Sequence, residues 1–209
     1  MKTREPHPPV KPTAQSTELP SQNKFALTAN AGVPADRFCT ALARNRRFAQ
    51  DDGHRGATPF PNLGLFVITC LDPRTDPAHF LGLNVSDAMV IRNVGGRVTP
   101  EVINHVAFIS QLAESVLPDG PLFEVAVIHH TQCGSAALVD DDFRRRYARR
   151  IGVDEVSLRG DAVLDATETV TRDVELLCRA SAISSRVTVS GHVYDVTTGL
   201  VETILPTLV

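Results

Sequence analysis

Three residues that could bind a metal ion stand where two predicted strands end. Cys70 directly follows the apolar run LGLFVIT (63–69), and His130 and Cys133 lie in HHTQCG (129–134), at the end of a second apolar run. An imidazole and two thiolates are ligands that suit zinc, and three protein ligands leave a fourth position open, as in catalytic zinc sites. The spacing alone fits equally well two buried thiols and a core histidine.

A carboxylate and a guanidinium follow Cys70 at two-residue steps. Pro73 favours an extended backbone, in which Cys70, Asp72 and Arg74 would point to the same side. Asp72 could become a fourth metal ligand or act as a base beside the metal, and Arg74 could pair with it and draw it off the metal. The alternative is an exposed salt bridge, which contributes little to stability.

The pattern of apolar runs predicts a mostly parallel β-sheet. Strands are expected at 63–69, 88–93, 123–130 and 186–196, and helices at 34–50, 99–116, 139–150 and 160–181. Apolar strands that alternate with helices are typical of a single α/β domain in which helices flank the central sheet. In such sheets ligands bind beyond the carboxyl ends of the strands, where Cys70 and His130 are expected.

Length and composition fit one folded domain preceded by a tail. The chain has 209 residues, of which 43% are hydrophobic and 22% charged. Residues 1–34 hold six of the fourteen prolines, which predicts a disordered, Pro-rich tail and a folded catalytic domain over 35–209. A formal charge of -3 disfavours a nucleic-acid partner.

The expected compartment is the cytoplasm. No apolar run approaches the ~20 residues that span a bilayer, and no leader with basic, apolar and small-residue regions is recognisable. We therefore expect no membrane contact, and four reduced cysteines.

The motifs resemble those of a known family. Two patterns are similar to the signature of the β-class carbonic anhydrases, a family that includes carbonyl sulfide hydrolase-like members: Cys70-x-Asp72-x-Arg74 and His130-x-x-Cys133-Gly134. The segments VIRNVGG (90–96) and VSGHVYDVTTGLV (189–201) resemble further parts of that family.

The resemblance implies a fold, a metal and a reaction. Cys70, His130 and Cys133 would bind one zinc ion per chain, with no other cofactor, and Asp72 and Arg74 would form a catalytic dyad. In an open state Arg74 holds Asp72 away and water takes the fourth position, whereas in a closed state Asp72 is the fourth ligand. The implied reaction is the reversible hydration of carbon dioxide to bicarbonate by a zinc-bound hydroxide.

Two other functions remain open. A carbonyl sulfide hydrolase would use the same site to convert carbonyl sulfide and water to carbon dioxide and sulfide. A non-catalytic structural zinc domain would keep Asp72 on the metal. The family also implies a homodimer or a dimer of dimers, with the active site near the subunit interface.

Three residues near the motifs are not expected to be ligands. His129 should point to the opposite face of its strand from His130, so we expect it to pack in the core or at an interface. The chain departs from the family pattern at Gln132, where short members often carry aspartate, and at Ser135, where many carry methionine.

Overall fold

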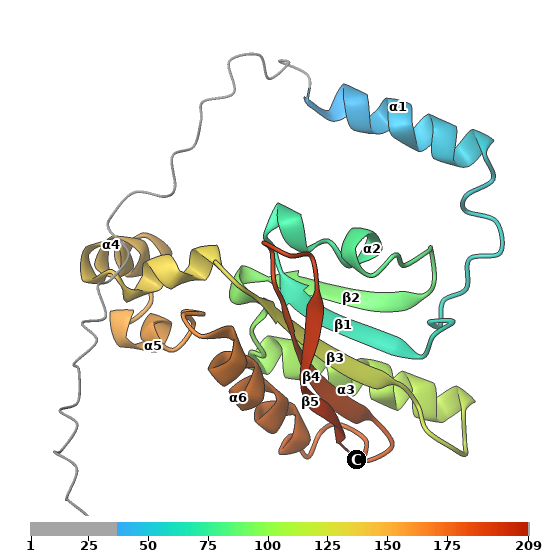
Figure 1. Cartoon of the computed structure of the whole chain (residues 1–209). Helices are drawn as coiled ribbons and strands as arrows, with labels where there is room; N and C mark the ends of the chain where they lie inside the picture. Colours follow the sequence, from blue (N-terminus) through green and yellow to red (C-terminus); the bar gives the residue numbers. More distant parts are fainter. Residues whose placement is uncertain (1–36, 209) are drawn as a thin grey trace, which may run out of the picture. The chain divides into compact units, whose positions relative to one another are not determined.

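A five-stranded sheet forms the centre of the unit that begins at Phe48. The computed structural model describes residues 37–208, with one compact unit ending at Arg47 and a second beginning at Phe48. The sheet has the order β2-β1-β3-β4-β5. Its strands are β1 (Leu65–Cys70), β2 (Ala88–Asn93), β3 (Glu124–His130), β4 (Thr188–Tyr194) and β5 (Val201–Leu208). The first four are parallel, which confirms the predicted α/β fold with a mostly parallel sheet (Figure 1).

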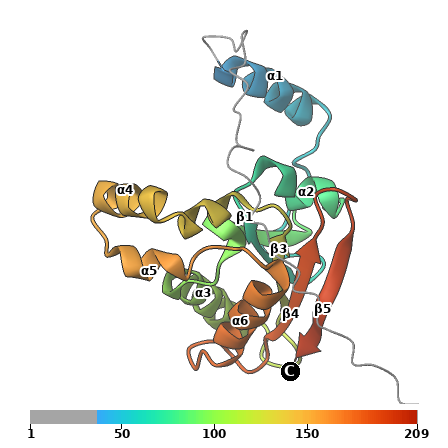
Figure 2. The same ribbon diagram turned by 60° about the vertical axis from the view of Figure 1, so that its left-hand side comes forward.

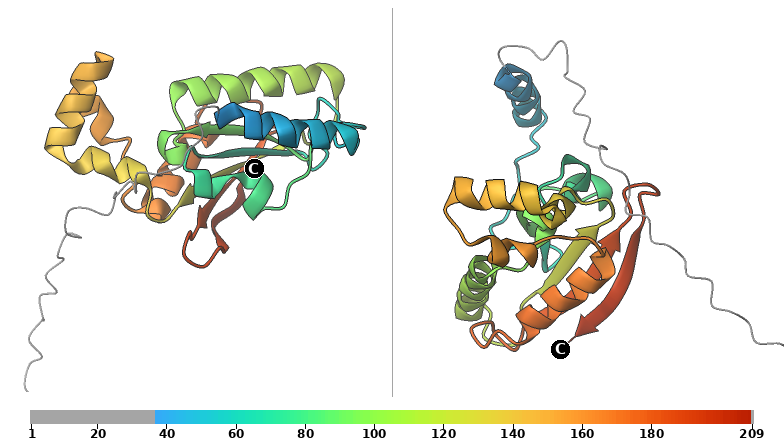
Figure 3. Two further views of the ribbon diagram at one scale, coloured as in Figure 1. Left: turned by 90° about the horizontal axis from the view of Figure 1, so that it is seen from above. Right: turned by 90° about the vertical axis from the view of Figure 1, so that its left-hand side faces the viewer.

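Residues 37–208 form six α-helices. They are α1 (Arg37–Gln50), α2 (Pro77–Phe80), α3 (Pro100–Val116), α4 (Asp141–Ile151), α5 (Glu155–Arg159) and α6 (Ala166–Cys178). Helices α3 and α6 cover one face of the sheet, where Val106 and Val174 belong to the same buried cluster as Ile68 and Val127 (Figure 2). Helices α4 and α5 extend away from the sheet (Figure 3). The tail predicted for 1–34 lies outside the described residues.

Local sequence explains where the long helices begin. The hydroxyl of Thr99 accepts a hydrogen bond from the amide of Val102, and Pro100 occupies the first turn of α3. Asp165 caps α6 by accepting hydrogen bonds from two backbone amides. The expected helix at 160–181 is therefore shorter than predicted, because Asp165 fixes the helix start after residues 160–164 have formed a loop.

The other face of the sheet carries a smaller apolar cluster. Val67, Ala126 and Ile128 pack there with Phe80 of α2 and with Tyr194. The rings of Phe80 and Tyr194 are stacked, with centroids 4.5 Å apart. The short helix α2, which the sequence pattern did not reveal, thus covers this face near the carboxyl ends of the strands.

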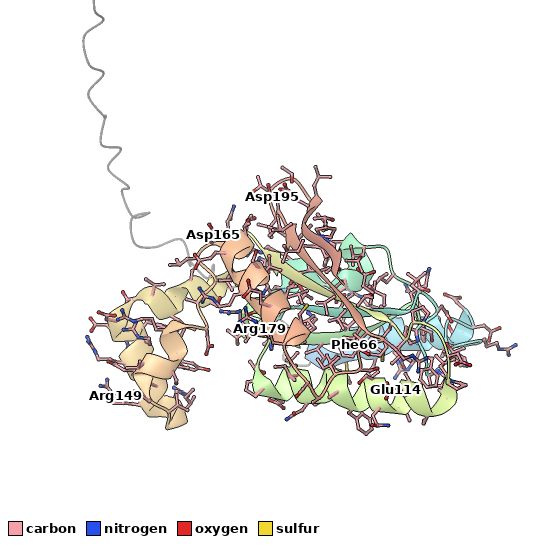
Figure 4. The ribbon with its side chains drawn as sticks, turned by 90° about the horizontal axis from the view of Figure 1, so that it is seen from below. Phe66, Glu114, Arg149, Asp165, Arg179 and Asp195 are labelled. Carbon is pink, nitrogen blue, oxygen red and sulfur yellow. The ribbon has the colours of Figure 1, made fainter. Side chains whose placement is uncertain are left out.

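The last expected strand, 186–196, proves to be the first half of a hairpin. Strand β4 ends at Tyr194, and β5 returns antiparallel to it as an edge strand. Asp195 lies at the turn, where its backbone amide bonds to the carbonyl of Leu200 (Figure 4). Pro206 lies inside β5, where proline is tolerated because the strand is at the sheet edge.

The parallel strands bring two of the predicted chemical segments to one edge of the sheet. Strands β1 and β3 are neighbours, and Thr69 lies opposite Ile128 in their register. The residues that follow, Cys70 and His129–His130, therefore leave the sheet side by side. Within residues 37–208, no helix has both the length and the hydropathy needed to cross a membrane.

Candidate metal centre

The three expected metal ligands converge at the carboxyl edge of the sheet. Cys70 ends β1, His130 ends β3, and Cys133 lies in the turn that leaves β3. Their ligand atoms all lie within 4.8 Å of one another, and all three residues are buried. The structure therefore brings Cys70 beside two groups that lie sixty and sixty-three positions further along the chain, because β1 and β3 are neighbours in the sheet.

The geometry of the two sulfurs fits a tetrahedral zinc ion. Cys70 Sγ and Cys133 Sγ are 3.8 Å apart. Two thiolates at a zinc–sulfur distance of about 2.3 Å and a tetrahedral angle would be separated by about 3.8 Å. The sulfur pair is thus already spaced for one shared ion, and it is too far apart for a disulfide bond.

His130 presents one nitrogen to this cluster. Its Nδ1 donates a hydrogen bond to the carbonyl oxygen of Thr131, 2.9 Å away, which places the proton on Nδ1 and the lone pair on Nε2. Nε2 is buried and has no hydrogen-bond partner within the described part of the chain. A buried nitrogen of this kind requires a partner, and a metal ion beside the two sulfurs would supply it.

The two thiols share negative charge. The contact with Cys133 is the main cause that lowers the pKa of Cys70, and the backbone amides of Asp72 and Gly95 act in the same direction against burial. The same contact, together with burial, raises the pKa of Cys133. The two thiols therefore influence each other's ionisation strongly, and a divalent cation bound between them would offset the repulsion between two thiolates.

Asp72 and Arg74 form a close pair beside the cluster. Arg74 Nε lies 2.9 Å from Asp72 Oδ1, and Arg74 Nη2 lies 2.7 Å from Oδ2. Hydrogen bonding to the Arg74 side chain lowers the pKa of Asp72 to about 2, so this carboxyl group is ionised at neutral pH. Arg74 Nη2 also donates to the carbonyl oxygen of Gln132. The carboxylate of Asp72 is not part of the group of mutually close ligand atoms.

The expected extended path from Cys70 to Arg74 is wrong. Asp72 is extended, with φ -52° and ψ 128°, as a residue before proline should be, but Pro73–Thr75 form a short 3-10 turn. Arg74 meets Asp72 because the turn folds its side chain back, and the Asp72 carboxylate also accepts from the Arg74 amide. Asp72 and Arg74 therefore pair as predicted, but through a turn capped by Asp72 and not through an extended segment that points both side chains to one side.

Arg92 fixes the backbone that carries the dyad, a role that sequence reasoning missed. From β2, its guanidinium donates to the carbonyl oxygens of Cys70 (2.9 Å) and Asp72 (2.7 Å), and it contacts Asp76 at 3.3 Å. The hydroxyl of Thr75 bonds to the same two carbonyls. An arginine that follows the apolar run of β2 was the available signal, because such a charge needs partners when it is half buried.

The Gly95–Gly96 turn packs against the end of β1. Both glycines have positive φ, 79° and 68°. A Cβ on Gly96 would lie 2.9 Å from the backbone nitrogen of Cys70, which is closer than side chains approach. Only glycine lets the backbone come this close to a metal-ligand candidate.

His129 points away from the cluster and joins a buried network, which confirms its predicted packing role. Its Nδ1 lies 2.8 Å from the hydroxyl of Thr169, and its Nε2 lies 3.2 Å from an oxygen of Asp173. The guanidinium of Arg97 donates two hydrogen bonds of 2.8 Å to the same carboxylate. The network ties β3 to α6 and to the turn that contains Gly96, so it supports the site from behind.

Comparison with known proteins agrees with the geometry. The family model described as carbonic anhydrase matches residues 65–153. Beta-carbonic anhydrase 1 of Mycobacterium tuberculosis is 30% identical over 166 residues, which cover 79% of this chain and 96% of that protein. Carbon disulfide hydrolase of Saccharolobus solfataricus is 26% identical over 157 residues, which cover 64% of this chain and 74% of the relative.

Solved structures show the same relationship. The carbonic anhydrase of Streptococcus mutans superimposes with a TM-score of 0.64 at 30% identity, covering 80% of this chain and 97% of that one. The carbonic anhydrase of Glaciozyma antarctica gives a TM-score of 0.60 at 27% identity, over 78% of this chain and 94% of that one. Because the similarity spans most of the described fold, in sequence and in structure, the chain belongs to the β-carbonic anhydrase family.

Proposed function

We propose that the chain reversibly hydrates carbon dioxide to bicarbonate with one zinc ion held by Cys70, His130 and Cys133. As a member of its family it is an enzyme that acts on a small molecule, and the family is zinc-dependent. The observation that carries the proposal is the side-by-side arrangement of this ligand set and the Asp72–Arg74 pair. A zinc ion at these ligands supplies the Lewis acidity that makes water a nucleophile near neutral pH.

The dyad would orient the attacking water. Asp72 is ionised at neutral pH, so it accepts a hydrogen bond and turns a water lone pair toward a linear electrophile. Arg74 donates hydrogen bonds to both carboxylate oxygens of Asp72 and to the carbonyl oxygen of Gln132. These bonds restrict the movement of Asp72. This arrangement supports the open state of the site and argues against a structural zinc domain in which Asp72 is the fourth ligand.

Hydrolysis of a sulfur-containing analogue is the second candidate. Three relatives at 24–27% identity are carbon disulfide hydrolases, and carbonyl sulfide, which resembles both carbon dioxide and carbon disulfide, needs the same attack on a linear carbon centre. The metal ligands and the dyad do not distinguish these substrates. Carbon dioxide is favoured because the most similar relatives named above are carbonic anhydrases.

A direct assay separates the candidates. Zinc-loaded protein is tested for carbon dioxide hydration by stopped flow at pH 7 and pH 8.5, and for sulfide release from carbonyl sulfide and carbon disulfide. Fast hydration with little sulfide release is expected. Sulfide release without hydration would transfer the proposal to the second candidate, and inactivity toward all three substrates with one zinc per chain would favour a structural site.

We further propose that the chain forms a homodimer, or a dimer of dimers, through an edge of the sheet. Among residues 37–208, β2 is an edge strand of the sheet, and Val90 on it is 44% exposed, so this edge could pair with a second copy of the chain. Light scattering at micromolar concentration should give twice the chain mass or a multiple of it. Val90→Lys should shift this mass toward that of one chain, and an unchanged mass would exclude pairing through β2.

A further inference from the structure

Ser135 lies directly behind the candidate metal centre. It is 6% exposed and sits in the short 3-10 segment Gly134–Val139 that follows Cys133. Its Oγ is 3.2 Å from the sulfur of Cys133 and 3.1 Å from the backbone nitrogen of Val163. The hydroxyl is therefore placed between one candidate ligand and a segment of chain nearly thirty residues away.

The direction of these hydrogen bonds follows from their chemistry. An amide nitrogen only donates, so the Ser135 oxygen accepts the bond from Val163. The single hydroxyl hydrogen is then free to point at the sulfur of Cys133. A metal-bound cysteine is a thiolate, which only accepts, so in the loaded site this bond must run from Ser135 to Cys133.

Burial fixes the hydroxyl in this orientation. Val163 is 3% exposed and belongs to the main apolar cluster, so its amide cannot turn to solvent. A Cβ on Gly95 would lie 3.2 Å from the Ser135 oxygen, so the Gly95–Gly96 turn closes the site from the other side. The serine has little freedom to choose another partner, so its oxygen is already placed beside the Cys133 sulfur.

A hydrogen bond to a thiolate changes what the sulfur gives to a metal. It stabilises the charged form of the ligand, so binding is tighter, and it withdraws electron density, so the sulfur donates less charge to the ion. We propose that Ser135 is a positioning residue that donates a hydrogen bond to the Cys133 thiolate, strengthens zinc binding and limits charge donation by this sulfur. This inference rests on the zinc site of the proposed function.

Ser110 offers a matched control. It is 2% exposed, its oxygen lies 3.4 Å from the amide nitrogen of Ser184, and its hydroxyl donates to the carbonyl of Ala107. Ser110 lies on α3, remote from the metal ligands along the chain and on another element. Ser110→Ala therefore removes a buried hydroxyl of the same kind without touching a ligand.

The test compares full-length wild type, Ser135→Ala, Ser135→Thr and Ser110→Ala. Zinc affinity is measured by competition with a chromophoric chelator, and the sulfur-to-cobalt charge-transfer band is recorded after Co²⁺ replaces zinc. We expect Ser135→Ala to weaken zinc binding by about 10- to 100-fold. Its charge-transfer band should move to longer wavelength, because a thiolate without the hydrogen bond is more easily oxidised.

The other variants decide what the change means. Ser110→Ala should leave affinity within about twofold of wild type and the band unmoved. Ser135→Thr keeps the hydroxyl and should retain the wild-type band. If Ser135→Ala does not fold, Ser135→Thr becomes the decisive variant. A shifted band in Ser135→Thr would overturn the proposal. Wild-type affinity and band position in folded Ser135→Ala would overturn it as well.

These readouts are independent of turnover. One outcome is that the wild type binds zinc and the Ser135 variants change affinity and band position as expected, while the wild type does not act on carbon dioxide. That result would refute only the proposed function. A wild type that binds neither zinc nor cobalt would overturn both proposals.

Discussion

Arg74 holds Asp72 through two parallel hydrogen bonds, from Nε to Oδ1 and from Nη2 to Oδ2. The fork of the guanidinium matches the two carboxylate oxygens, so the pair fixes the plane of Asp72 as well as its position. Arg74 is in turn held by the carbonyl of Gln132, whose backbone has φ 56° and whose side chain donates to Thr197. The orientation of one carboxylate thus depends on a chain of contacts that reaches the β4–β5 turn.

Replacement of Arg74 should reduce catalysis and leave zinc in place. Arg74→Ala frees Asp72 to rotate, and a misplaced catalytic group costs on the order of 10²-fold in rate. Arg74→Lys keeps the charge but cannot make both bonds, so we expect an intermediate loss. Stopped-flow hydration with zinc analysis on the same samples measures both effects. Arg55→Lys, in the exposed pair with Asp52, is the control and should be unchanged. Full activity of Arg74→Ala would remove the dyad from the mechanism.

Arg92 should matter for the backbone of the site. Arg92→Met leaves the carbonyls of Cys70 and Asp72 without a shared donor, so the loop should loosen and zinc affinity should fall by about tenfold or more. Arg186 is a matched control, because it also bridges two backbone carbonyls, those of Leu117 and Gly120, away from the metal ligands. Chelator competition should give wild-type affinity for Arg186→Met. Equal affinities for the two variants would mean that Arg92 has no special role.

The convergence of Cys70, His130 and Cys133 could be predicted because these residues stand at or just after the ends of predicted strands. Cys70 and the segment from His130 to Cys133 follow apolar runs, and the carboxyl ends of parallel neighbours must meet. The Asp72–Arg74 pairing was predicted correctly, but the path between them was not, because local capping by Asp72 competes with extension after Pro73. The sequence pattern thus identified which residues pair and misjudged how the backbone lets them do so.

The supporting residues could not be predicted, because their partners are distant in sequence. Arg92 bonds to carbonyls twenty or more positions away, and Ser135 bonds to Val163. The spacing of apolar residues in the sequence does not predict which backbone groups a polar side chain will contact after folding. Strand β5 was missed for a different reason: it is an edge strand that contains a proline, and its pairing with β4 is created by the tertiary structure.

Gly96 should not tolerate a side chain. Gly96→Ala places a Cβ 2.9 Å from the amide nitrogen of Cys70 at a φ of 68°. Gly120→Ala meets the same backbone penalty, at φ 83°, with nothing within 4 Å, and so isolates the cost of positive φ. We expect about 1–2 kcal/mol of destabilisation for Gly120→Ala. Gly96→Ala should lose about 1–3 kcal/mol more, together with zinc affinity, because the backbone of Cys70 must shift. Urea unfolding measures the first effect and chelator competition the second; equal losses in the two variants would show that the close approach is unimportant.

Asp173 should make folding dependent on pH below about pH 4. Burial raises its pKa, but hydrogen bonds from Arg97, His129 and the amide of Val98 outweigh burial, and the net pKa is lowered. A carboxyl group with a lower pKa in the folded state than in the unfolded state stabilises the fold above its unfolded pKa of about 3.9. That contribution is lost as pH falls through the folded-state pKa.

Asp173→Asn tests this dependence. The variant leaves Arg97, whose side chain is 8% exposed, without its carboxylate, so we expect a loss of about 3–5 kcal/mol in unfolding free energy at pH 7. The difference in unfolding free energy between wild type and variant should become smaller between pH 4 and pH 2.5, because the wild type loses the stabilisation that the variant lacks. Glu168→Gln, which breaks an exposed pair with Arg172 on the same helix, should cost less than about 1 kcal/mol. Urea unfolding across this pH range measures the gap directly, and a gap that stays constant down to pH 2.5 would mean that Asp173 does not titrate as the buried network requires.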